Sequence, residues 1–181
     1  MKKIYKGRVV DLNLEEVRLP NGRAIQLEII RHSGAAAAVP LKDDGNVVLV
    51  RQFRYAAGGM IYEIPAGRLE PGEAPLDCAS REMKEEAGWE AQRWDRLGAI
   101  WTTPGFTDEK IHLFLARGLV ETKRALEQDE VIEVLEIPLD RALAMVQRGE
   151  IQDGKTICAL SLAAGFLKAG GGPEEFRNPE A

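Results

Sequence analysis

Alternating apolar and polar residues predict three strands at the start of the chain. The alternation covers residues 4–12, 15–19 and 24–30, and the turn-forming sequence Leu19-Pro20-Asn21-Gly22 separates the last two segments. Strands joined by such short turns pair antiparallel. We therefore expect residues 1–35 to form a small N-terminal antiparallel β region.

Two apolar runs, at 35–41 and 47–53, follow this region and predict two further strands. The sequence Lys42-Asp43-Asp44-Gly45 between them is typical of a hairpin turn. A short apolar segment at 60–64 predicts another strand, which leads into Pro65-Ala66-Gly67.

Segment 75–87 has the pattern of a helix with defined ends. Pro75 suits a first helical turn, and Gly88 suits the left-handed position just after the last turn. Apolar residues recur there at helical spacing (Leu76, Ala79, Met83 and Ala87). Farther along, the pattern predicts strands at 97–101, 111–116 and 131–137 and helices at 139–147 and 155–167.

This order of elements is typical of a mixed α/β (α+β) fold, in which helices pack on a mixed or antiparallel sheet. We expect the main domain to cover residues 36–169. Gly170-Gly171-Gly172-Pro173 begins a polar segment, so residues 170–181 are expected to form a flexible tail.

Composition narrows the class of protein. The 181 residues are 45% hydrophobic and 29% charged, a globular balance that excludes a disordered or fibrous chain. No apolar run approaches the roughly 20 residues that span a bilayer, and residues 1–7 lack the apolar stretch of a signal peptide. Cys78 and Cys158 form no CxxC pair, so we expect free thiols in a cytoplasmic protein that does not enter the membrane.

Acidic residues are concentrated in one window. The net charge is −5, and residues 63–90 alone hold eight acids against three bases, an excess equal to that of the whole chain. No basic stripe suggests nucleic-acid binding. Glu82, Glu85 and Glu86 share one side of the predicted helix, where each like-charge pair costs about 0.2–0.5 kcal/mol. Such a cluster is either a solvated face or a site for a hard divalent cation such as Mg²⁺.

The residues around these glutamates form a longer motif. The chain matches the pattern GX5EX7REUXEEXGU, in which U is a bulky apolar residue, at every specified position (Gly67, Glu73, Arg81, Glu82, Met83, Glu85, Glu86, Gly88 and Trp89). This segment resembles the Nudix box. The resemblance implies the family's α/β/α sandwich, in which a mixed sheet lies between helices.

The resemblance also implies roles for single residues. Glu82 and Glu86 match direct metal ligands, Glu85 matches one that acts through water, and the carbonyl oxygen of Ala66 is a further ligand. Arg81 matches an arginine that orients the glutamates. The implied ion is Mg²⁺, with Mn²⁺ or another divalent ion as an alternative, and it would hold a diphosphate and activate a water molecule.

Two upstream segments narrow the substrate class. Arg51-Gln52-Phe53-Arg54 and Glu63-Ile64-Pro65-Ala66-Gly67 resemble segments of ADP-ribose pyrophosphatases and related nucleoside diphosphate-sugar pyrophosphatases. Because arginine binds phosphate oxygens through two parallel hydrogen bonds, Arg54 is our first candidate for contact with the diphosphate and Arg51 our second. Glu63 would hold a metal or an arginine, or form a structural ion pair.

A proline-containing loop follows the motif. Pro104 lies 15 residues after Trp89 (104 − 89), and a proline near this place is typical of the ADP-ribose pyrophosphatase subfamily. A turn there would let the backbone of Gly105 and the carboxylate of Glu109 face a ribose or a phosphate. Trp101, just before this loop, would either line the pocket or fill the core.

Two further expectations come from the same subfamily. Its general base lies on a loop after the sheet, and the matching stretch favours Glu130, with Glu127 second. Its members are homodimers whose N-terminal strands complete the partner's site, so residues 1–35 are expected to mediate a strand-swapped dimer.

Together these features imply Mg²⁺-dependent hydrolysis of ADP-ribose to AMP and ribose 5-phosphate. The alternative is another nucleoside diphosphate sugar, such as GDP-mannose or ADP-glucose, because the box contacts only the diphosphate. A third interpretation is a non-catalytic sensor of nucleotide sugars. Such sensors typically lack intact box glutamates, which this chain keeps.

Overall fold

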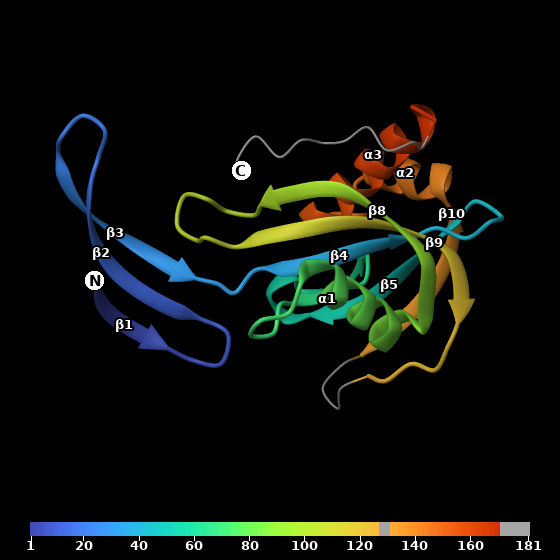
Figure 1. Ribbon diagram of the computed structural model, residues 1–181, viewed down its shortest axis with the longest axis horizontal. Coiled ribbons are helices and arrows are strands. Elements are labelled where there is room, and N and C mark those ends of the chain that lie inside the picture. The colour runs from blue at the N-terminus through green and yellow to red at the C-terminus, as the bar shows by residue number, and fades with distance from the viewer. Residues whose placement is uncertain (127–130, 171–181) are drawn as a thin grey trace.

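The computed structural model describes residues 1–126 and 131–170 (Figure 1). The N-terminal residues form a separate antiparallel sheet of β1 (Lys2–Lys6), β2 (Asp11–Arg18) and β3 (Ala24–Arg31). The prediction of one continuous strand over 4–12 is wrong. The chain turns where the Gly7 N–H donates to the Val10 carbonyl at 2.8 Å, because a glycine interrupts the alternating pattern.

Strand β3 attaches this sheet to the rest of the molecule, from which it extends to one side (Figure 1). The Ile30 N–H donates to the Phe106 carbonyl at 2.8 Å, and the His32 N–H donates to Asp108 Oδ1 at 2.7 Å. Arg31 forms ion pairs with Glu15 and Asp108. The N-terminal sheet therefore holds the proline-containing loop in place.

The hairpin predicted over 35–53 is half right. The turn forms, and Leu41 bridges Val47, but β4 (Ala35–Pro40) and β5 (Asn46–Arg54) then enter different sheets. Both runs are apolar on both faces, so each strand needs cover on two sides, which a lone hairpin cannot supply.

The two sheets of the main body divide the remaining strands between them. β5 is the central strand of an antiparallel sheet, flanked by β10 (Ile132–Pro138) and β6 (Gly59–Glu63), and the 3-10 helix η1 (Tyr55–Ala57) joins β5 to β6. The other sheet is mixed, because β4 pairs parallel with its neighbour β9, and its order is β7 (Ala66–Arg68), β4, β9 (Lys110–Glu121) and β8 (Trp89–Trp101).

Helices cover both faces of the mixed sheet, so the predicted α/β/α sandwich is confirmed (Figure 1). Along β4, Ala35, Ala37 and Val39 join the core under α2 (Leu139–Gln147) and α3 (Gly154–Lys168). The alternate residue Ala36 packs on the opposite side with α1 (Pro75–Glu82). None of the described helices is both long and apolar enough to cross a membrane.

The helix predicted at 75–87 has the expected extent and end. Gly88 follows it in the left-handed region with φ of +77°. Only its first part is α-helical, however, because residues Met83–Ala87 (η2) form one π-helical turn. Such wider turns occur often at functional sites, and this one carries Glu85 and Glu86.

Candidate active site

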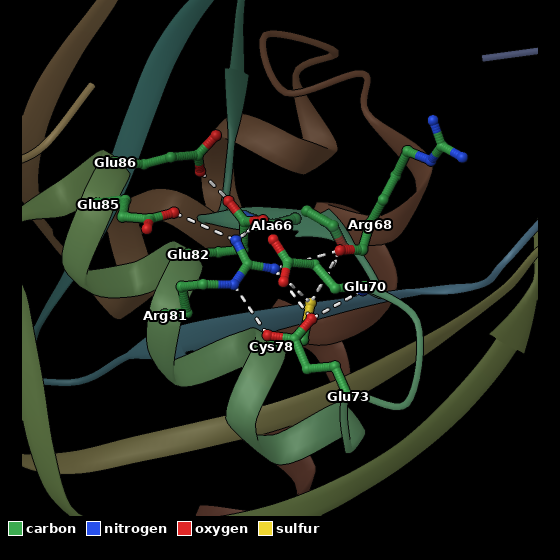
Figure 2. Close-up of polar contacts among 10 residues, drawn as sticks. Ala66, Arg68, Glu70, Glu73, Cys78, Arg81, Glu82, Glu85 and Glu86 are labelled. Atoms are coloured by element: carbon green, nitrogen blue, oxygen red, sulfur yellow. Dashed lines mark hydrogen bonds and ion pairs between the residues drawn. The ribbon is translucent and has the colours of Figure 1, made fainter. Parts of the chain in front are cut away.

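Arg81 lies at the centre of a group of glutamates (Figure 2). Its Nε and Nη2 donate to the two oxygens of Glu73 at 2.8 and 3.0 Å. Its Nη1 donates to Glu82 at 2.6 Å and to Glu85 at 3.2 Å. Arg81 therefore sets the positions of two box glutamates and partly neutralises them.

Contacts to the backbone tie the loop of the box to α1. Arg81 Nη2 donates to the Arg68 carbonyl oxygen at 3.2 Å, and the Arg68 side chain points away from the glutamates (Figure 2). The Glu70 N–H donates to Glu73 at 2.9 Å. The buried Cys78 thiol lies 3.5 Å from the Gly67 carbonyl oxygen. The loop and the start of the helix therefore form one rigid unit.

The Glu73 carboxylate should make the fold sensitive to acid. Hydrogen bonds from Arg81 and from the Glu70 N–H lower the pKa of Glu73 from 4.5 to about 2. The folded state thus binds fewer protons than the unfolded state, and Glu73 stabilises the fold above pH 4.5. This contribution is lost as the pH falls from about 4.5 towards 2.

Replacement of Glu73 by glutamine should therefore lower the melting temperature at pH 7 and flatten its decline between pH 4.5 and 2. Circular dichroism melts across this range would measure both effects. Glu90→Gln is the matched control, because Glu90 is exposed and pairs only with Lys84 among the described contacts. Identical pH slopes for Glu73→Gln and the wild type would contradict the assignment.

Glu82 lies directly against Gly67. A Cβ at Gly67 would come within 1.8 Å of Glu82 Oε1, so any side chain there would displace the carboxylate. Gly67 does not have a positive φ, so the close approach of Glu82 is what requires glycine here. Gly72 differs, since its φ is +81° and open space surrounds it, as expected of a turn glycine.

The third box glutamate is buried at the base of the same cluster. Glu86 is only 4% exposed, and its Oε2 accepts a hydrogen bond from the Ala66 N–H at 3.0 Å. This bond joins η2 to the start of β7, where the Ala66 carbonyl oxygen was expected as a ligand.

The cluster fits a divalent metal ion by the chemistry of its donors. Three box carboxylates lie together, Arg81 pairs with two of them (Glu82 and Glu85), and Gly67 leaves bare backbone beside Glu82. Hard cations prefer such oxygen donors. Within the described residues, no three acidic, histidine or cysteine side chains already surround one point, and Arg81 Nη1 donates to both Glu82 and Glu85.

A second cluster is built around Glu63, which is 2% exposed. Arg54 Nε and Nη2 donate to its two oxygens at 2.7 and 2.9 Å, and Lys155 Nζ donates at 2.6 Å. Burial would raise the pKa of Glu63, but these hydrogen bonds and the charge of Lys155 outweigh it and hold the pKa below its usual value. Of the three roles left open for Glu63, the structure shows that it holds an arginine.

Sequence reasoning missed Lys155. It lies at the start of α3, 92 residues from Glu63, and also pairs with Asp153 at 3.0 Å. Asp153 caps the helix by accepting from the Thr156 N–H. The cap was readable from Asp153-Gly154-Lys155-Thr156, but nothing in the sequence connects that cap with β6.

Two hollows meet across β7. The first, which we call the carboxylate groove, measures about 580 Å³ and holds Arg81 and the three box glutamates. Arg8 and Val9, from the turn between β1 and β2, also line it and were missed by sequence reasoning. The second, the β8 pocket, measures about 650 Å³ and holds Trp101, Glu109 and Lys155. The residues common to both are Arg54, Ala66, Gly67 and Arg68.

The other predicted substrate residues are placed differently. Glu109 lines the β8 pocket and accepts from Thr102 Oγ1 at 2.7 Å. Arg51 lies on the face of β5 opposite to Arg54 and pairs with Glu133 at 3.2 Å, and it is not among the described residues that line either hollow. Gly105 is exposed on its loop and likewise lines neither.

Two predicted residues lie outside the described part of the chain. Glu127 and Glu130, the candidates for the general base, fall in the segment between residues 126 and 131. Most of the predicted tail, residues 171–181, is also outside it.

Comparison with known proteins places the chain in a family. Residues 31–160 match the NUDIX domain model. The chain is 45% identical over 161 residues to an ADP-ribose pyrophosphatase of Bacillus subtilis (strain 168), covering 88% of this chain and 87% of the relative. It is 42% identical to a methanol dehydrogenase activator of Bacillus methanolicus, with the same coverage of 88% and 87%.

A solved structure shares the fold. The crystal structure of an ADP compounds hydrolase superposes with a TM-score of 0.81 at 20% identity, covering 94% of this chain and 92% of that one. The domain match spans more than half of the chain and includes the whole box motif. The chain belongs to the Nudix family.

Proposed function

We propose that this protein hydrolyses the diphosphate bond of ADP-ribose to AMP and ribose 5-phosphate, with Mg²⁺ as its metal ion. The observation that carries the proposal is the junction of the carboxylate groove and the β8 pocket at β7. A nucleoside diphosphate sugar has the matching order of parts, since its charged diphosphate lies between less charged groups. The 45% identical relative is named for this activity.

Glu82 and Glu86 would hold the metal ion with the Ala66 carbonyl oxygen, and Glu85 would act through water. When bound, the ion neutralises phosphate charge and lowers the pKa of a water molecule for attack on phosphorus. Arg81 keeps Glu82 and Glu85 on the groove side of the helix through Nη1. The proposed metal site would thus lie on a rigid helix and loop, which favours catalysis by fixing its geometry.

Arg54 would bind the diphosphate where the two hollows meet. Glu63 holds its Nε and Nη2, whereas Nη1 has no partner in the described part of the chain and can donate to a phosphate oxygen. The buried carboxylate and Lys155 keep the guanidinium in one orientation. Such preorganisation reduces the entropy lost on binding.

Glu130 is our proposed general base, with Glu127 as second candidate. Glu130→Gln should lower kcat strongly and leave the Mg²⁺ concentration for half-maximal activity nearly unchanged, because a base acts on water and not on the metal. Measuring the activity of Glu130→Gln and of Glu127→Gln at increasing Mg²⁺ concentration would separate the two candidates. An unchanged rate in Glu130→Gln would move the base elsewhere.

We also propose that the chain acts as a strand-swapped homodimer through residues 1–35, in the cytoplasm. Large apolar side chains are exposed on this region (Ile4, Tyr5, Val9 and Val10), which is typical of a covered surface. Both cysteines are free, as predicted, which suits a reducing compartment.

Sedimentation should give a dimer, and deletion of residues 1–31 should give a poorly active monomer. A fully active monomer would contradict the proposed strand-swapped dimer.

The test of the function is a screen of nucleoside diphosphate sugars with Mg²⁺ and product identification. We expect ADP-ribose to give the highest kcat/KM, with AMP and ribose 5-phosphate as products. A higher kcat/KM for GDP-mannose or ADP-glucose would change the substrate and keep the chemistry. Stoichiometric binding without AMP release would instead identify a sensor.

A further inference from the structure

We propose that Trp101 is the platform on which the substrate's nucleobase stacks in the β8 pocket. The inference rests on the proposed function, because it assigns a place to the base of a nucleoside diphosphate sugar. It also names a binding residue that the box motif cannot reveal, since the box contacts only the diphosphate.

The choice of platform is narrow. Among the described residues that line the two hollows, only two are aromatic: Phe53 in the carboxylate groove and Trp101 in the β8 pocket. Both are about half exposed, Trp101 at 54% and Phe53 at 52%. Every base has a π-face, so stacking on an aromatic ring is the general means of holding one.

The surroundings favour Trp101. Charged residues are more numerous in the carboxylate groove, which has eight, than in the β8 pocket, which has five. A base in the groove would displace the hydration of four arginines and four glutamates (Arg8, Arg54, Arg68, Arg81, Glu70, Glu82, Glu85 and Glu86). The β8 pocket has an apolar wall formed by Ala35, Ile100, Ile111 and Cys158. An aromatic base buries its faces there at lower cost, while its diphosphate reaches Arg54.

Trp101 is held in a defined position. It pairs with Lys110 across β8 and β9, and Lys110 Nζ lies 5.4 Å from the centre of its ring, a cation–π distance. A base would therefore use the face opposite to the ammonium. Beside the ring, Thr102 holds the Glu109 carboxylate at 2.7 Å, within the same pocket, where it can accept from ribose hydroxyls.

The other two tryptophans show by contrast that Trp101 does not serve the core. Trp89 packs with Val48 and Ala87, and Trp94 meets Phe114 edge to face at 6.3 Å between ring centres. Trp101 instead separates the β8 pocket from a smaller hollow of about 300 Å³ beneath the N-terminal sheet. A large indole exposed between two hollows contributes little to folding, so we assign it to ligand binding.

The experiment compares Trp101→Ala, Trp101→Phe and Phe53→Ala in the full chain. With ADP-ribose, Trp101→Ala should raise KM by about ten-fold or more, given the usual strength of base stacking, and change kcat much less. Trp101→Phe should recover most of the loss. With ribose 5-diphosphate, which lacks a base, Trp101→Ala should change KM less than about two-fold.

A binding readout separates this inference from the proposed function. AMP should quench tryptophan fluorescence in the wild type, the quench should disappear in Trp101→Phe, and it should persist in Trp94→Phe. If wild type hydrolyses ADP-ribose and Trp101→Ala keeps its KM and affinity for AMP, the inference fails alone. A KM increase confined to Phe53→Ala would place the base in the carboxylate groove and also overturn it. If wild type does not hydrolyse ADP-ribose, the proposed function fails, and the AMP titration still decides the role of Trp101.

Discussion

Replacement of Glu86 by glutamine is expected to lower kcat by about 10²–10³-fold with little loss of stability. A bound divalent ion contributes several kcal/mol to stabilising a phosphoryl transition state, and each 1.36 kcal/mol corresponds to a factor of ten in rate. Removing one anionic ligand should forfeit much of that contribution. Steady-state kinetics across a Mg²⁺ titration would measure the loss.

The fold should survive this change, because glutamine keeps an oxygen that can accept the hydrogen bond from the Ala66 N–H. The melting temperature is therefore expected to stay within a few degrees of wild type, because a loss of about 1 kcal/mol of stability lowers it by only a few degrees. The matched control is Glu90→Gln, which should leave kcat unchanged, because Glu90 is exposed and lies three residues after Ala87, the last residue of the helix. Equal loss of activity in both variants, or unfolding of Glu86→Gln, would contradict a metal-binding role.

Replacement of Gly67 by alanine is expected to abolish most activity, by about 10²-fold or more. The new Cβ would lie 1.8 Å from Glu82 Oε1, so the carboxylate must leave its present position. Displacing a reacting group by about 1 Å commonly costs about 10²-fold in rate. Moving the Glu82 carboxylate should also lower stability, because it breaks the ion pair with Arg81 at 2.6 Å. Kinetics and chemical denaturation would measure both losses.

A second substitution tests the cause. In a Gly67→Ala background the Glu82 carboxylate has already left its place, so Glu82→Ala should cost little further stability, and activity stays low. This non-additivity is the expected result of a double-mutant cycle for touching residues. Gly165→Ala in α3 is the control, because open space surrounds Gly165. If the stability losses of Gly67→Ala and Glu82→Ala simply add, contact with Glu82 is not why position 67 is glycine.

The elements read most accurately from the sequence were those with local signals. Helix α2 has the predicted bounds, and Gly88 ends the box helix in the left-handed conformation that only glycine adopts at little cost. The π-helical turn at Met83–Ala87 was not predicted, because the apolar spacing and the terminal glycine of this segment are those of an ordinary α-helix. The split of β4 and β5 was also missed, since a turn sequence specifies the reversal of the chain and not the later partners of its strands.

The sequence by itself determined the family and the identity of the box residues, because these lie within 23 consecutive positions and their spacing alone places three carboxylates on one side of a helix. Only the tertiary structure decided that Glu63 holds Arg54 together with Lys155, that Arg51 faces away from the hollows, and that Trp101 lines a pocket. These contacts join residues far apart in the chain. They depend on which sheet each strand enters and which face it presents, and no local periodicity carries that information.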